Sequence, residues 1–68
     1  MMAVNKELDG KETYVFYWRS SQPLLFNVVA IDADSFEEAR KLFRQLFSDR
    51  VGKGEKVYAC KLVGEVRL

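Results

Sequence analysis

The strongest constraint on the fold of this chain is a pair of strand-forming runs that are apolar on both faces. Residues 13–18 read TYVFYW, and every one of these residue types favours β-strands. A short segment that contains the single proline, residues 19–23, separates this run from a second one, LLFNVVAI, at residues 24–31. Two such runs joined by a few turn-type residues predict an antiparallel hairpin.

One amphipathic helix is predicted after the hairpin. Ser35, followed three residues later by Glu38, is typical of a capping box in the first turn of a helix. Glu37 and Lys41 are four residues apart and are expected to form an ion pair on the polar side of the helix. The helix is expected to end near residues 48–51. Its apolar stripe follows from residues at helical spacing: Phe36, Ala39, Leu42, Phe43, Leu46 and Phe47.

A third strand is predicted over residues 57–68, where apolar and charged side chains alternate. The order of elements is then ββαβ. We expect the aromatic first strand to lie in the centre of an antiparallel sheet of order 2-1-3, because its two apolar faces are most useful there. The fold class is therefore α+β: a small single-layer antiparallel sheet with one helix packed on one face.

The chain is expected to form a single domain over residues 1–68, because 68 residues are well below the length of a typical domain. An extra N-terminal edge strand over residues 3–8, joined to the first strand by a turn at Asp9-Gly10, is one alternative for the N-terminal region. The other alternative is a flexible segment over residues 1–11.

The composition argues against an enzyme. A chain of 68 residues has a thin core and little room for a deep pocket. With no histidine and one cysteine, the chain lacks the usual ligands of a structural zinc site and the base of a Ser-His-Asp triad. Asp32 and Asp34 are interpreted as carboxylates that favour the start of a helix, and Cys60 as a buried structural residue. We expect no catalytic residue, metal or cofactor.

The sequence favours a cytoplasmic protein. The lone Cys60 cannot form an internal disulfide, which argues against a small secreted domain. The first ten residues, MMAVNKELDG, lack the apolar run of a signal peptide. The longest apolar stretches are of strand length and too short to span a membrane as a helix.

A single helix leaves one face of the sheet without cover. Sorting the strands by odd and even positions assigns the even set, which carries no charge, to the helix. The odd set would then form an exposed apolar surface, and such surfaces mark interaction sites. A homodimer is the first expectation for its occupant, and a different protein the second. The predicted interface consists of Val15, Tyr17, Arg19, Leu25, Asn27, Val29, Ile31 and Lys61.

The uneven distribution of charge along the chain indicates an alternative partner, a nucleic acid. Residues 1–38 carry three basic and seven acidic side chains, whereas residues 40–56 carry six basic and two acidic ones. Basic groups in this second segment could contact the phosphates of a nucleic acid. The candidate contacts are Arg40, Lys41, Arg44, Arg50, Lys53 and Lys56.

The passage from the second strand into the helix, VVAIDADSFEEA at residues 28–39, resembles that of many small α+β proteins. It is similar to the ββαβ pattern of the archaeal ribosomal protein LX family and of some phage-encoded inhibitors such as anti-CRISPR proteins. The likeness covers these residues alone and assigns no family. The resulting hypothesis is a non-catalytic protein–protein interaction module, a regulatory or inhibitory accessory protein that associates with itself. The alternative is a nucleic-acid-binding module.

Overall fold

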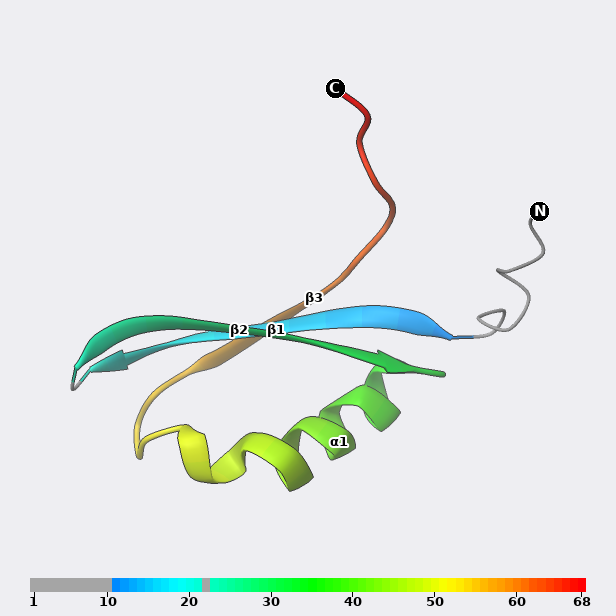
Figure 1. The fold of residues 1–68 in the computed structure, drawn as a ribbon. Helices are drawn as coiled ribbons and strands as arrows, with labels where there is room; N and C mark the ends of the chain where they lie inside the picture. The colour runs from blue at the N-terminus through cyan, green and yellow to red at the C-terminus, as the bar shows by residue number, and fades with distance from the viewer. Residues whose placement is uncertain (1–10, 22) are drawn as a thin grey trace.

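The computed structural model of the chain describes residues 11–21 and 23–68 and contains one sheet and one α-helix (Figure 1). The first two strands are β1 (Glu12–Ser21) and β2 (Leu24–Ala33). They are followed by the helix α1 (Phe36–Phe47), a short 3-10 turn η2 (Ser48–Arg50) and the strand β3 (Val57–Lys61). The helix lies below the sheet in Figure 1, and no helix of residues 11–21 and 23–68 lies on the other side.

The sheet has the predicted topology. Its strand order is β2-β1-β3, and β1 pairs antiparallel with both neighbours. The aromatic strand is therefore central, and the expected α+β fold is confirmed. The register places Phe16 opposite Val29 of β2 and opposite Ala59 of β3. Since opposite residues point to the same side of a sheet, even positions of β1 share a face with odd positions of β2 and β3.

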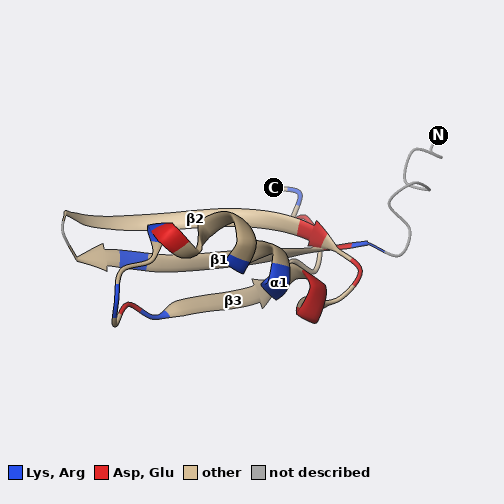
Figure 2. Cartoon of the chain, turned by 90° about the horizontal axis from the view of Figure 1, so that it is seen from below, with Lys and Arg blue, Asp and Glu red and all other residues tan. Residues whose placement is uncertain are grey.

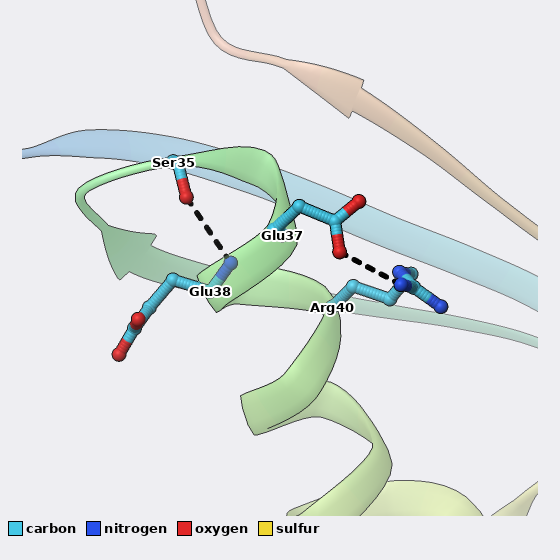
Figure 3. A network of polar contacts seen from close by, with 4 residues as sticks. All are labelled: Ser35, Glu37, Glu38 and Arg40. Carbon is cyan, nitrogen blue, oxygen red and sulfur yellow. Dashed lines mark hydrogen bonds and ion pairs between the residues drawn. The ribbon is translucent and has the colours of Figure 1, made fainter.

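The start of α1 follows the predicted cap in part (Figure 3). The backbone N–H of Glu38 donates to Oγ of Ser35 at 3.2 Å, which satisfies one of the free amides of the first turn. The Glu38 carboxylate points away from Ser35, so the reciprocal half of the capping box is not formed. The ion pair of Glu37 is made with Arg40 at 2.7 Å and not with Lys41.

The core lies between α1 and the two strands of the hairpin. Phe43 contributes most from the helix, since its ring stacks on Phe16 at 4.6 Å and meets Trp18 edge-on at 5.4 Å. Leu46, predicted to belong to the apolar stripe, is 61% exposed. The buried core consists of Tyr14, Phe16, Trp18, Ile31, Ala33, Ala39 and Phe43.

The third strand is shorter than predicted. It ends at Lys61, and the N–H of Leu62 makes one more bond, to the carbonyl of Thr13 at 2.8 Å. The antiparallel register explains the end, because Leu62 already lies level with Thr13, next to the first residue of β1. The predicted N-terminal edge strand at residues 3–8 and the turn at Asp9-Gly10 lie outside the described residues.

Candidate interaction surface

The register divides the sheet into two faces of different character. We call the side that α1 packs against the covered face, and the other side the open face. On β1, the even residues Tyr14, Phe16 and Trp18 belong to the covered face and are 3–6% exposed. No element within residues 11–21 and 23–68 lies over the open face. Its residues are Thr13, Val15, Tyr17, Arg19 and Ser21 of β1, Leu24, Phe26, Val28, Ala30 and Asp32 of β2, and Tyr58 and Cys60 of β3.

The centre of the open face is apolar and exposed. Tyr17 lies between Val28 and Tyr58 on the neighbouring strands, and the rings of Tyr17 and Tyr58 stack at 5.5 Å. Phe26 is 77% exposed and Val28 is 66% exposed. Because cross-strand neighbours touch, these side chains form a continuous patch across all three strands. Such a patch is typical of an interaction site.

The two ends of the open face carry opposite charges. Arg19 lies opposite Phe26 at one end, and a hollow of about 260 Å³ there is also lined by Glu55, Lys56 and Tyr58, so the two cations outnumber the one carboxylate. Asp32 lies at the other end, where its carboxylate accepts a hydrogen bond from the hydroxyl of Thr13. The face is therefore an apolar centre between a basic end and an acidic end.

The structure divides the predicted interface between the two faces. Val15, Tyr17 and Arg19 lie on the open face, as predicted. The placement of the other five on that face is wrong. Ile31 is 9% exposed and belongs to the core, and Val29 packs against it. The residues that the register places on the side of the helix are Leu25, Asn27, Val29, Ile31 and Lys61.

Two of these residues make polar contacts on the side of the helix. The Asn27 amide donates to the Ser20 hydroxyl at 2.9 Å, and the ammonium of Lys61 lies 3.2 Å from the Glu12 carboxylate. Cys60, predicted to be buried, is exposed on the open face.

The error has two physical sources, which are the length of the hairpin loop for β2 and the point at which the chain returns after α1 for β3. Sorting all strands by the same parity assumes that opposite residues have numbers of equal parity. In the structure Ser21 pairs with Leu24, so only two residues separate the strands and opposite residues differ in parity. The even residues of β2 were therefore assigned to the wrong side. Those of β3 were assigned to the wrong side as well, because the chain returns after α1 in a register that pairs Tyr17 with Tyr58. The open-face residues missed in this way are Phe26, Val28, Ala30, Tyr58 and Cys60.

The helix also leaves a groove on its own side of the sheet. α1 packs on β2 and β1, and an opening of about 250 Å³ remains between the helix and β3. Phe36 is 43% exposed there, and Val57 of β3 is 37% exposed. The helix therefore leaves part of β3 uncovered on this side of the sheet. The groove is lined by Phe16, Phe36, Arg40, Phe43, Arg44, Val57 and Ala59.

The predicted nucleic-acid contacts do not form one surface. Arg40, Lys41 and Arg44 belong to α1, on the opposite side of the sheet from the open face (Figure 2). Arg40 pairs with Glu37, and the guanidinium of Arg50 lies 5.8 Å above the ring of Phe47. Lys53 lies in the loop before β3, and Lys56 borders the basic end of the open face.

Several polar groups of the described residues make contacts within the chain. Asp34 pairs with Lys11 at 3.5 Å, and the described residues contain no group of three or more Cys, Asp or Glu side chains placed to hold a metal ion. The Glu12 carboxylate accepts a hydrogen bond from the Tyr14 hydroxyl and lies near the Lys61 ammonium. Both contacts lower the pKa of Glu12, the hydrogen bond most, while the hydrogen bond to Glu12 raises the pKa of Tyr14. α1, of 12 residues, is too short to cross a membrane, and so is every other helical segment described.

Comparison of the chain with protein families, with curated proteins and with solved structures gave no match.

Proposed function

We propose that this chain is a non-catalytic protein–protein interaction module and that its open face binds the open face of a second copy. The observation that carries the proposal is the exposed apolar centre around Tyr17, Val28 and Tyr58. Burying a large apolar side chain contributes about 1.5–3 kcal/mol, so a second sheet over this patch would be strongly stabilising. We further propose an accessory role, regulatory or inhibitory, that the dimer exerts by occupying a surface of another protein.

Charge complementarity supports a second copy as the occupant. The open face has Arg19 and Lys56, with the single carboxylate of Glu55, at one end and Asp32 at the other, so the two ends differ in net charge. Two copies packed face to face with their strands running in opposite directions place the basic end of each over the acidic end of the other. A two-fold axis produces this arrangement, and both subunits then use the same patch. Packing with the strands in the same direction would oppose like charges.

The test is Val28→Lys, measured by light scattering over a range of protein concentrations. Val28 lies in the centre of the face and is 66% exposed, so the lysine fits the folded monomer and disrupts the apolar contact. We expect a dimer for the wild type and a monomer for Val28→Lys. The matched control is Leu46→Lys, because Leu46 is similarly exposed, at 61%, but lies on α1. This variant should remain a dimer.

The fold of each variant is checked by circular dichroism and by the fluorescence of Trp18, the single tryptophan, which is 3% exposed. A wild type that stays monomeric at the highest attainable concentration would contradict the proposal. An unchanged dimer in a folded Val28→Lys variant would contradict it as well.

A single-stranded nucleic acid is a second candidate for the same face. The stacked rings of Tyr17 and Tyr58, with Arg19 and Lys56 beside them, resemble the combination of aromatic and basic groups on which bases stack. Titration of a fluorescent single-stranded RNA separates the two candidates. Binding to phosphates weakens steeply as salt increases, whereas apolar self-association does not. Salt-sensitive RNA binding that is lost in Tyr17→Ala would favour the nucleic acid.

A further inference from the structure

The segment that follows β3 leaves the sheet on the side of the open face. Leu62 makes the last backbone hydrogen bond seen in the described part of the chain, to Thr13. Residues 62–68 then rise from the sheet on the side opposite α1 (Figure 1), and the view from the helix side (Figure 2) shows their end behind the sheet. This segment is exposed along its whole length. We call it the C-terminal arm.

The arm presents apolar side chains to solvent. Val63 is 91% exposed and Val66 is 81% exposed, and Leu68 is fully exposed. The arm also carries Glu65 and Arg67, which lie 3.6 Å apart. The sequence predicts a strand here because of its alternating pattern, but no strand of the described chain pairs with it. The arm therefore presents apolar side chains that no surface within the described residues covers.

We infer that the arm of each copy packs on the open face of the partner in the dimer, against the end that carries Phe26. This inference rests on the proposed function. Packed sheets lie about 10 Å apart, and a seven-residue extended segment reaches roughly 23 Å, so the arm can cross the gap and continue over the partner. The arm starts at the Asp32 end of its own face, because Leu62 lies beside Thr13.

The proposed two-fold axis puts the basic end of the partner above this starting point. Phe26, at 77% exposure, is the most exposed open-face residue of the hairpin and lies at that end. Val66 and Leu68 cover the ring of Phe26 in the partner. The paired Glu65 and Arg67 of the arm meet Arg19, Glu55 and Lys56 of the partner, which border the same end. The arm thus completes the burial of the part of the face that is furthest from its centre.

The first test is the dissociation constant of the dimer in the double variant Val66→Asp, Leu68→Asp. Loss of two apolar contacts, with two added charges, should raise the dissociation constant at least about tenfold. The folded monomer should be unaffected, because both side chains are exposed in it. The matched control is Leu46→Asp, an apolar-to-acidic change on α1 that should leave the constant unchanged. An unchanged constant in the double variant would overturn the inference, while Val28→Lys tests the face itself.

The second test is a disulfide between copies. Two single-cysteine proteins are prepared in a Cys60→Ser background, one with Phe26→Cys and one with Val66→Cys, then mixed and treated with a mild oxidant. We expect a mixed disulfide dimer on a non-reducing gel, in greater yield than either protein forms alone. A mixture of Leu46→Cys with Val66→Cys, in the same background, is the control and should give no such product. Absence of the mixed product in a sample that light scattering shows to be dimeric would overturn the inference and leave the proposed function standing.

Discussion

The two faces of the sheet are equally rich in apolar residues and differ in what lies over them. Phe16 and Trp18 on the covered face are each 3% exposed, whereas Phe26 and Val28 on the open face are 77% and 66% exposed. Phe16 and Trp18 come from β1, and Phe26 and Val28 come from β2, but along each strand the residues of the two faces alternate. The difference arises from one element, α1, which packs on one side of the hairpin.

This comparison separates the residues that stabilise the fold from those that are available for function. An apolar side chain under α1 has its partner within the chain, so its burial contributes to the stability of the monomer. An apolar side chain on the open face finds a partner only outside the described residues. Substitutions on the covered face should therefore change unfolding at every protein concentration. Substitutions on the open face should change only the part of the stability that depends on concentration.

The largest expected effect is that of Phe43→Ala compared with Phe26→Ala. Phe43 is 6% exposed and packs on Phe16, Trp18 and Phe47. Its truncation should lower the free energy of unfolding by about 3–5 kcal/mol, a loss typical of a buried phenylalanine. Phe26→Ala should reduce only the concentration-dependent part of the stability. Chemical denaturation at several protein concentrations measures both, and equal losses in dilute solution would contradict the assignment of the two faces.

A sharper form of the comparison uses two neighbouring valines of β2. Val29 packs against the core, while Val28 points to the open face. Val29→Lys should lower the free energy of unfolding by about 2 kcal/mol, because a partly buried aliphatic group that packs on the core is lost and a charge must reach solvent. Val28→Lys should change the unfolding of the dilute monomer by no more than about 0.5 kcal/mol. If thermal and chemical denaturation rank the two variants in the opposite order, the register of β2 is wrong.

Local patterns in the sequence were sufficient to predict the elements and their order. Hydrophobic periodicity predicted the helix, Ser35 predicted the position of its N-cap, and the aromatic run predicted the central strand. The faces of β2 and β3 could not be predicted from parity alone, because parity carries over between strands only when the loop length is known. Pairing of Ser21 with Leu24 reverses the phase of β2, and the position of β3 depends on where the chain returns after α1.

The existence of the candidate site was therefore predicted from the sequence, but only some of its residues were. The count of apolar residues against a single helix correctly predicted an uncovered apolar face. Tyr17 was correctly placed on that face, while Val28 and Tyr58 on either side of it were missed. The end of β3 at Lys61 could not be predicted from the sequence either. Apolar and charged residues alternate up to residue 68, but Leu62 already lies beside Thr13, near the start of β1, so the residues after it have little of β1 left to pair with.

The smallest expected effect concerns the polar contacts that join β1 to β3 on the covered side, beyond the reach of α1. Glu12 accepts a hydrogen bond from Tyr14 at 2.8 Å and lies 3.2 Å from Lys61, and these contacts lower the pKa of its carboxyl group below the ordinary value of 4.5. A lowered pKa in the folded state means that the ionised carboxylate stabilises the fold. This contribution is complete above the pKa of the unfolded chain and is lost as the pH falls through the folded pKa. Glu12→Gln should therefore be less stable than the wild type at neutral pH, with a difference that shrinks in acid.

Denaturation of both proteins from about pH 7 to about pH 2 measures this difference, since the range spans the ordinary pKa of a carboxyl group. The effect should be small and should decrease with added salt, because Glu12 and Lys61 are both about half exposed. Glu65→Gln is the matched control: Glu65 also pairs with a cation but lies in the C-terminal arm, so its loss should not change the unfolding of the dilute monomer. A difference between Glu12→Gln and the wild type that stays constant down to acid pH would show that the charge of Glu12 does not support the pairing of β3. The stability of this strand would then rest on its backbone hydrogen bonds to β1.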